Sequence, residues 1–354
     1  IQEETPAING APLLKDNYDD GMKVEPEYYI PMMPMILVNG ASGIGTGWST
    51  DIPSYNPEEI RKNIIRSLNG QDLEPMNPWY NGFKGTITKL SNNSYLTKGV
   101  YTIEGNKLIV TELPIGKWTQ KFQDELEDMM NNPKNTLVRY YNSYCTDTKV
   151  HYVIVCDENE LFDLDIYDQQ YGMTTMEYHF KLYSKISTSN MYLYDSNIKL
   201  KKYNNELEIL EDYLQVRSKF YGDRITYIIN ELIKTLDVLE YKMKFIKEFI
   251  DETIKIIRVK KADIISQLKE RNYPEVEGTY DYLIKMHIYN LSEDKIDELQ
   301  KQIDDKNAEL VTMKKETVKS FWTRELEDLK FTDNNAVIKM KFSKKTNKKT
   351  NKKN

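Results

Sequence analysis

Cysteine, histidine and long apolar runs are scarce in this sequence, and each scarcity excludes a class of protein. The two cysteines among 354 residues, Cys145 and Cys156, provide neither a disulfide framework nor a CxxC motif, which favours a reducing intracellular setting. No apolar run reaches the roughly 20 residues that span a bilayer and no signal peptide opens the chain, so we expect no membrane partner. His151, His179 and His287 match no metal or triad spacing. The sequence therefore predicts no self-contained catalytic or metal site.

The net charge of −6 is unevenly distributed along the chain. Residues 339–354 contain eight lysines and no acid, and removing these eight positive charges from −6 leaves −14 on the remaining residues. A body of that charge repels phosphate overall, so any contact with a nucleic acid would have to come from local basic surfaces. The repeated TNKK sequence predicts a disordered tail at 336–354. Such a tail is a solvated extension, a trafficking signal or an auxiliary DNA contact.

The most distinctive stretch is Val24 to Thr50, VEPEYYIPMMPMILVNGASGIGTGWST, in which an apolar run leads into a glycine-rich segment. A large apolar residue, Ile44, stands between Gly43 and Gly45. A phosphate-binding loop is excluded, because no Gly-Lys-Ser/Thr follows and Pro53 arrives before a helix can run. An isoleucine on flexible glycines is either tucked into the core or offered to a partner.

Local patterns predict an α+β organisation for the first part of the chain. Residues 56–69 predict an amphipathic helix with Asn56 as its N-cap and Pro57 as its first residue. Residues 1–23 are irregular or contain a short helix at 13–20. Strand signals punctuated by glycines then predict a mixed α+β domain, and they lie at 85–90, 99–105, 107–113 and 149–156.

Apolar residues at helical spacing predict one helix over 207–259, about 80 Å long at 1.5 Å per residue. That length implies a coiled coil or projecting arm, and residues 292–329, capped by Ser292, supply an antiparallel partner. Short helices lie between them, around a break at 274–278. The apolar residues of this globule fill its own core, or some of them form a dimer interface, and the two are compatible: Tyr280, Tyr282, Leu283, Ile284, Met286 and Ile288.

The stretch Val24 to Thr50 closely resembles the segment that follows the active-site tyrosine in eukaryotic and large-virus type IIA DNA topoisomerases. The resemblance implies that Ile44 inserts between base pairs and bends the duplex. Residues 111–126, TELPIGKWTQKFQDEL, resemble the family's ELP…TWTQ element, where a strand turns into a helix, and we expect Trp118 to pack in its core. Residues 181–195, KLYSKISTSNMYLYD, resemble a family segment that lines DNA; a polar strand–loop connection is the alternative.

The DNA-binding residues expected from these motifs contact the backbone without reading bases: Asn39, Ser42, Gly43, Gly45, Thr46, Lys117, Gln120, Lys181, Lys185, Ser187, Thr188, Ser189 and Asn190. The family places its nucleophile upstream of the Ile44 segment, so chain order excludes the Arg139-Tyr140-Tyr141 sequence. We therefore expect no catalytic and no metal-binding residue in this chain.

The resemblance implies four regions: the end of a winged-helix region at 1–23, a DNA-bending tower domain at 24–197, a coiled-coil arm with a helical C-gate at 198–335, and the tail at 336–354. It implies a part of a larger ATP-hydrolysing DNA topoisomerase. The resemblance implies that Mg²⁺ and ATP serve domains upstream of this chain, in the same polypeptide or a companion subunit. Residue 1 is Ile and not Met, so we expect a piece of a longer polypeptide or a processed product.

The implied partners are double-stranded DNA and a second copy bound through the C-gate. The implied location is intracellular, in the nucleus or in a viral factory in host cytoplasm. The alternative is a non-catalytic architectural protein that shares the DNA-bending and coiled-coil module.

Overall fold

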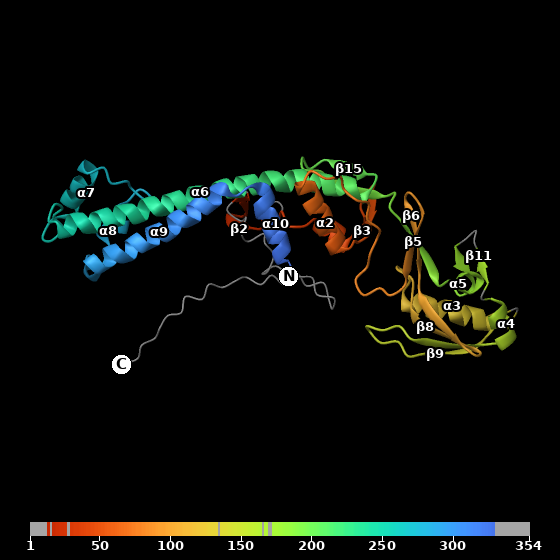
Figure 1. Cartoon of the computed structure of the whole chain (residues 1–354). Helices are drawn as coiled ribbons and strands as arrows, with labels where there is room; N and C mark the ends of the chain where they lie inside the picture. The colour runs from red at the N-terminus through yellow and green to blue at the C-terminus, as the bar shows by residue number, and fades with distance from the viewer. Residues whose placement is uncertain are drawn as a thin grey trace, which may run out of the picture. The chain divides into compact units, whose positions relative to one another are not determined.

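The computed structural model divides into two compact units. Figure 1 labels its helices and strands and colours them from red near the N-terminus to blue near the C-terminus. The first contains residues 30–217 and 323–329, and the second contains the described residues up to 29 together with 218–322. The predicted tail at 336–354 lies outside the described residues, and the predicted domain boundary at 197/198 stays a prediction. The structure describes residues 13–14, 16–26, 29–133, 135–164, 166–168 and 172–329.

A β-hairpin near the start of the described chain replaces the short helix expected at 13–20. β1 (Asn17–Asp19) pairs antiparallel with β2 (Met22–Val24). Asp20 and Gly21 connect them with φ of 47° and 80°, the two positive values of a type I′ turn, which an Asp-Gly dipeptide favours. The helix prediction is wrong because this turn signal outweighs a weak helical pattern.

The apolar run and the glycine-rich segment form a short helix followed by a hairpin in the first unit. α1 (Met35–Asn39) is followed by β3 (Ala41–Ile44) and β4 (Ser49–Ile52), which pair antiparallel. α2 (Pro57–Leu68) comes next. The glycine-rich segment is therefore a structured hairpin.

α2 begins where the sequence predicts. Asn56 Oδ1 accepts a hydrogen bond from Glu58 N at 2.9 Å, and Pro57 is the first helical residue. Ile60 and Ile64 are fully buried, so one face of the helix packs in the core, as expected from its period.

Two antiparallel sheets follow, with strand orders β7-β8-β10-β9 and β13-β6-β5. All four strand signals are confirmed, as β5, β7, β8 and β10. The strands are β5 (Thr86–Ser91), β6 (Ser94–Lys98), β7 (Val100–Glu104), β8 (Lys107–Glu112), β9 (Val138–Ser143), β10 (Tyr152–Cys156) and β13 (Tyr183–Ser187).

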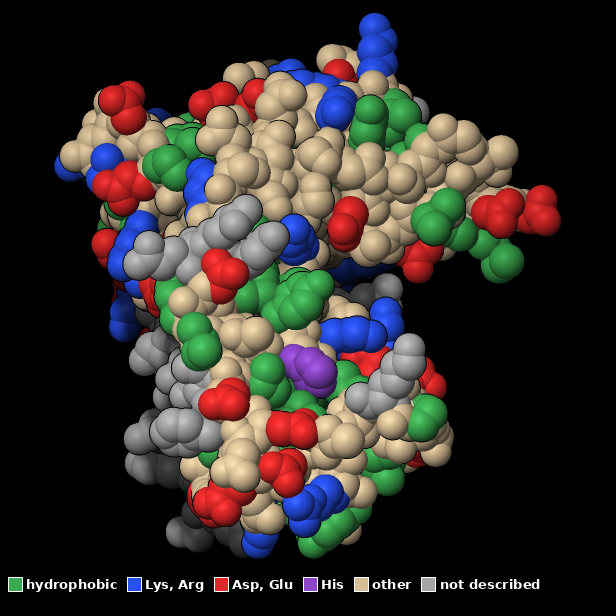
Figure 2. Space-filling view, turned by 90° about the vertical axis from the view of Figure 1, so that its right-hand side faces the viewer, with side chains coloured by type: hydrophobic (Ala, Val, Ile, Leu, Met, Phe, Trp, Pro, Cys, Tyr) green, Lys and Arg blue, Asp and Glu red, His purple; other side chains and the backbone are tan. Residues whose placement is uncertain are grey.

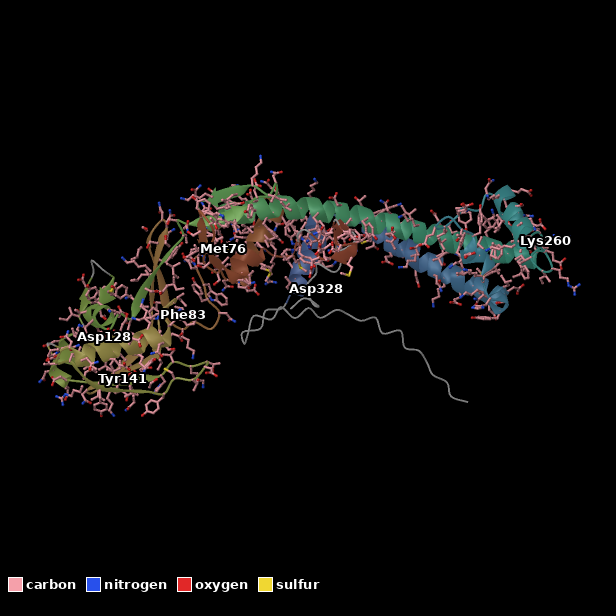
Figure 3. The ribbon with its side chains drawn as sticks, turned by 180° about the vertical axis from the view of Figure 1, so that it is seen from behind. Met76, Phe83, Asp128, Tyr141, Lys260 and Asp328 are labelled. Carbon is pink, nitrogen blue, oxygen red and sulfur yellow. The ribbon has the colours of Figure 1, made fainter. Side chains whose placement is uncertain are left out.

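α3 (Thr119–Asn131) packs on the four-stranded sheet, which confirms the predicted strand-to-helix transition after β8. Phe122 is buried with its ring centroid 5.1 Å from that of Tyr152. Figure 3 labels Asp128 on α3 and Tyr141 on β9, at the same end of this unit. Trp118, in contrast, is 79% exposed. Its predicted core position is wrong because its extended backbone, at ψ 145°, precedes the helix.

Smaller elements complete the first unit. β11 pairs with β12, and β14 pairs with β15. In chain order they are α4 (Glu158–Asp163), β11 (Tyr167–Asp168), β12 (Met173–Thr174), α5 (Thr175–His179), β14 (Met191–Tyr194) and β15 (Leu200–Tyr203).

α6 (Glu206–Ile250) starts in the first unit and ends in the second. Its 45 residues give a length of about 68 Å. The prediction of a helix to residue 259 is corrected here: Glu252 has φ 54°, which ends the helix, and the chain turns so that Ile254 joins the core of the globule. No helix in the described residues meets the length and hydropathy of a membrane span.

In the second unit, α6 packs against α9 (Glu293–Lys315) through a cluster that includes Leu232, Leu236, Ile303 and Leu310. The expected partner helix over 292–329 is broken at Glu316, whose ψ of 141° is extended, and continues as α10 (Val318–Asp328). Ser292 occupies the N-cap position but makes no side-chain capping bond.

A small globule lies between these helices in the sequence. It contains α7 (Lys261–Glu270), α8 (Asp281–Ile284) and η2 (Ile288–Asn290). Tyr280 and Leu283 belong to its buried core, and Tyr282, Ile284 and Met286 pack against that core. The first of the two alternatives for these residues, packing within the globule, therefore describes these five; the Ile288 side chain lies outside the described residues.

Candidate nucleic-acid interface

The β3–β4 hairpin displays Ile44 at its tip. Ile44 pairs with Ser49 across the hairpin, and the amide of Gly45 donates to the Trp48 carbonyl at 2.8 Å to close the turn. The Ile44 side chain is 94% exposed. The core position that was one of the two interpretations of this isoleucine is therefore excluded, and its contact with a partner stays a prediction.

Two glycines at this hairpin have positive φ values that other residues adopt only with strain. Gly40 has φ 67° and ψ 173°, a region that is essentially restricted to glycine. Gly47 has φ 90° in the turn. Of the other predicted contact residues of this segment, Asn39, Ser42 and Thr46 are exposed.

Residues 190–194 lie along the β3–β4 hairpin, although they are about 140 positions away in sequence. Asp51 N donates to Asn190 O at 2.8 Å, and Asn190 Nδ2 donates to Ser49 Oγ at 2.9 Å. Tyr192 N donates to Thr50 Oγ1 at 3.0 Å. The structure thus joins two of the three sequence motifs expected to contact DNA.

The remainder of that polar segment follows β13 to its end. Lys185 is exposed on the strand, and the hydroxyls of Ser187 and Ser189 share a 2.8 Å hydrogen bond at the surface. Thr188 is buried, and its amide donates to Asn93 O at 3.0 Å. The expectation that Thr188 contacts DNA is the least supported of this group, because its side chain faces the protein.

Lys117 and Lys181, the third group, are engaged with the protein around Glu125. Lys117 forms an ion pair with Glu125, and its Nζ donates to Lys181 O at 2.8 Å. Lys181 Nζ lies 3.6 Å from Glu125 Oε1. Burial lowers the pKa of the Lys117 ammonium, and the Glu125 carboxylate opposes this shift. Lys117 therefore holds the chain at residue 181, while Lys181 remains exposed. Gln120 is exposed and donates to Asp124 Oδ1 at 2.8 Å.

The exposed side chains of this arrangement offer apolar and polar contact chemistry. Acidic and basic side chains are interspersed over the face drawn in Figure 2, which shows no single large basic patch. No group of three or more His, Cys, Asp or Glu side chains in the described part of the chain is placed to hold a metal ion. The Arg139 guanidinium forms an ion pair with Asp157 Oδ2 at 2.7 Å. Separately, burial raises the pKa of the Cys156 thiol to about 12.

Comparison with known proteins assigns the family. A family model that describes the A subunit of DNA gyrase/topoisomerase IV matches residues 10–327. The chain belongs to this DNA gyrase/topoisomerase IV family. The resemblance to type IIA topoisomerases predicted from the residues is thereby confirmed.

Individual members of the family match over most of this chain. DNA topoisomerase 2 of Penicillium chrysogenum is 36% identical over 349 residues, which cover 90% of this chain and 22% of that protein. DNA topoisomerase 2-alpha of Rattus norvegicus is 36% identical, with 87% and 22% covered. The chain thus spans about a fifth of the length of these curated relatives.

A solved structure of the family matches the fold. The crystal structure of the Plasmodium falciparum topoisomerase II DNA-binding, cleavage and re-ligation domain superimposes with a TM-score of 0.79 at 34% identity. The match covers 90% of this chain and 46% of that chain. The mixed α+β fold class is confirmed by this similarity.

Sequence reasoning missed two aromatic residues that support the hairpin of this family member. The rings of Trp48 and Tyr194 meet edge to face with centroids 6.3 Å apart. A β-carbon on Gly45 would lie 3.5 Å from the Trp48 ring, so the ring lies under the turn that carries Ile44. The Gly-Trp-Ser sequence after the turn was a signal for Trp48, whereas nothing local pointed to Tyr194.

Proposed function

We propose that this chain is the part of a type IIA DNA topoisomerase that binds and bends duplex DNA, with Ile44 as the wedge. The observation that carries the proposal is the 94% exposure of an isoleucine at the end of a braced two-strand hairpin. Such an exposed apolar tip has the shape of the wedges that enter the minor groove, unstack a base step and bend the duplex, at a cost of a few kcal/mol per step. The bend offsets this cost by bringing more DNA into contact.

Polar groups beside the tip are suited to hold the DNA backbone. Ser42 and Thr46 flank Ile44, and the hydrogen bond from Asn190 to Ser49 brings the 187–190 segment beside the hairpin. Hydroxyl, amide and ammonium groups of this kind contact phosphate and fix register without reading sequence. Family membership favours this function over that of a non-catalytic architectural protein, and we expect the protein where genomic duplex lies, in the nucleus or a viral factory in host cytoplasm.

Strand cleavage and ATP hydrolysis belong, in this proposal, to parts of the enzyme outside this chain. The chain spans 22% of the topoisomerase 2 relatives, and the described residues hold no cluster that fits Mg²⁺. The Mg²⁺ and ATP that the family implies are therefore assigned to other domains of the complete enzyme, and this chain contributes the grip on the DNA and its bend.

The direct test is the bend itself. A duplex labelled at both ends should show an increase in FRET when the purified chain binds, at low ionic strength where phosphate contacts are strongest. Binding without any change in FRET would contradict the wedge proposal while leaving DNA binding intact.

Neutralising Lys181 and Lys185 should weaken binding about equally for all sequences. Each lost phosphate contact reduces the slope of log K against log salt by about one. The measurement is a salt titration by fluorescence anisotropy with two unrelated duplexes. Lys107→Ala, an exposed lysine on β8 outside the proposed interface, is the matched control. A loss for only one of the two duplexes would argue against backbone contact.

We also propose that the second unit contains the dimer contact of the complete enzyme, at its helical globule. Tyr289 and Ile257 are exposed there, with the Tyr289 ring stacked 5.5 Å from His287. Exposed apolar residues grouped on one small globule are typical of isologous interfaces. The antiparallel pair α6 and α9 would then be the arm that carries this contact.

Sedimentation velocity should find a concentration-dependent dimer of the full chain. Tyr289→Arg should shift the equilibrium toward monomer, because a charge would be buried at the interface. Tyr140→Arg, on β9 of the first unit and also exposed, is the control and should leave the dimer intact. If the full chain sedimented as a monomer at every concentration, the proposed dimer contact would be contradicted.

A further inference from the structure

A second hairpin displays a second exposed isoleucine beside the wedge. β14 and β15 pair antiparallel from Met191↔Tyr203 to Tyr194↔Leu200, and residues 195–199 form the turn. Ile198 in that turn is 61% exposed, and Tyr194 and Leu200 at its base are exposed as well. Tyr194 packs edge to face against Trp48, whereas packing buries little of the Ile198 side chain at the tip.

The contacts between the two hairpins place their tips at the same end. Asp51 bonds Asn190, Thr50 bonds Tyr192, and the ring of Trp48 contacts that of Tyr194. The residue numbers therefore fall on the first hairpin as they rise on the second. The β4 and β14 strands therefore run antiparallel, and the turn at 45–48 and the turn at 195–199 point the same way. The two hairpins form separate two-stranded sheets, and the contacts between β4 and β14 hold them side by side.

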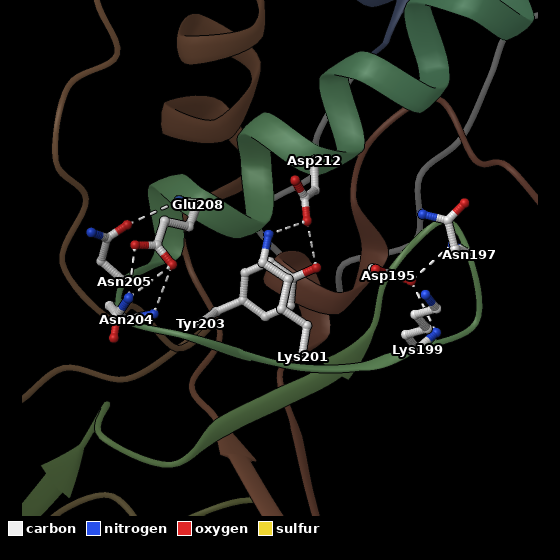
Figure 4. A network of polar contacts seen from close by, with 9 residues as sticks. All are labelled: Asp195, Asn197, Lys199, Lys201, Tyr203, Asn204, Asn205, Glu208 and Asp212. Carbon is white, nitrogen blue, oxygen red and sulfur yellow. Dashed lines mark hydrogen bonds and ion pairs between the residues drawn. The ribbon is translucent and has the colours of Figure 1, made fainter.

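The turn holds Ile198 in an unfavourable backbone conformation. Asp195 Oδ1 accepts hydrogen bonds from Asn197 N at 2.8 Å and Lys199 N at 2.9 Å (Figure 4). Within this turn Ile198 has φ 59°, in the left-handed region that a β-branched residue rarely occupies. Glycine or asparagine would adopt this conformation more easily, so folding alone does not explain an isoleucine here.

The base of the hairpin is fixed to the start of α6. Asp212 Oδ2 accepts from Lys201 Nζ at 2.8 Å and from Tyr203 Oη at 2.7 Å, both on β15 (Figure 4). The Lys202 ammonium lies 5.8 Å from the centroid of the Tyr192 ring. The tip is therefore presented on an anchored hairpin, as a contact residue requires.

We propose that the tip of the β14–β15 hairpin is a second DNA contact, in which Ile198 packs against deoxyribose faces of the groove and Lys199 meets a flanking phosphate. This inference rests on the proposed DNA-bending function. Because the two hairpins are neighbours with their turns at the same end, both tips would meet the same duplex, whose helical turn is roughly 34 Å long.

The charge of the hairpin favours DNA over a protein surface as the occupant. Lys199 and Lys202 lie on or beside β15. The nearby carboxylates are internally engaged: Asp195 closes the turn, and Asp212 binds Lys201 and Tyr203 at the hairpin base. An apolar tip flanked by cations matches the sugar faces and phosphates of a groove. The tip is also continuous with the wedge hairpin through the Trp48–Tyr194 contact.

The test replaces Ile198 with asparagine in the full chain. Ile198→Asn keeps a residue that tolerates the left-handed turn, so thermal stability should be unchanged or raised. Ile166→Asn, at an isoleucine of the first unit that is 64% exposed, is the matched control. Hydroxyl-radical footprinting reports on deoxyribose exposure, and anisotropy measures the dissociation constant.

We expect Ile198→Asn to lose sugar protection on the flank of the wedge site and to weaken binding about tenfold, the order expected for a lost apolar contact. The salt slope should stay unchanged, and Ile166→Asn should behave as wild type. Equal footprints and affinities for wild type and Ile198→Asn would overturn the proposal. The proposal would also be overturned if Ile198→Asn bound DNA like wild type but had a different sedimentation coefficient, because the tip would then be a protein contact. FRET bending by the wild-type chain is scored separately, so failure of the wedge is distinguishable from failure of this second contact.

Discussion

Ile44→Ala is expected to abolish most of the FRET change that accompanies DNA binding. The alanine side chain is too short to hold a base step open from the hairpin tip, so the duplex stays closer to straight. Affinity should fall only about threefold, because the cost of unstacking disappears together with the contacts that the bend creates. The measurement is FRET efficiency at saturating protein, with the dissociation constant from the same titration.

The stability of the Ile44→Ala variant should equal that of the wild type within about 0.5 kcal/mol, since the side chain is 94% exposed. A difference in bending then reports on the DNA contact and not on folding. Ile44→Met, which keeps an extended apolar side chain, should retain most of the bend. Ile166→Ala removes an exposed isoleucine elsewhere in the unit and controls for general apolar loss. Full bending by Ile44→Ala would remove the basis of the wedge proposal.

Local sequence signals predicted the parts of this fold that depend on local physics. Asn56 caps α2 as expected, since its side chain needs only the amide two residues ahead. The glycine-punctuated strands were likewise predicted from composition and turns. The end of α6 was not predicted correctly. Glu252 adopts a positive φ there, although the sequence has no glycine or proline of the kind that usually marks such a position.

Most features of the site that were not predicted depend on contacts between residues far apart in the sequence. In the sequence Lys117 has no evident acidic partner, but the fold gives it Glu125 and the carbonyl of Lys181, 64 positions away. Trp118 lies four residues before Phe122 and would share its face in a continuous helix, yet it precedes the helix. The pairing of the Ile44 hairpin with Asn190 depends on hydrogen bonds across 141 positions. Only the family resemblance pointed to both segments.

Gly40→Ala is the substitution that should most strongly disturb both fold and function. Gly40 combines φ 67° with ψ 173°, where alanine is strained by about 1–3 kcal/mol. A β-carbon there would lie 2.7 Å from Ile52 O and 3.0 Å from Ser54 N, and neither backbone group can move without shifting β4. Strain and overpacking together predict a loss of about 3 kcal/mol or more.

That loss corresponds to a fall in Tm of roughly 6–12 °C for a unit of this size, measured by scanning calorimetry of the full chain. Gly43→Ala is the matched control for stability: its φ is not positive, and nothing lies within 4 Å of the added carbon. Its Tm should stay near that of the wild type. Because β4 carries the turn that presents Ile44, Gly40→Ala should also lose bending well below its own Tm. A variant that unfolds early yet bends DNA normally when folded would mean that the hairpin position is set by Asn190 and Tyr192 rather than by the glycine at its base.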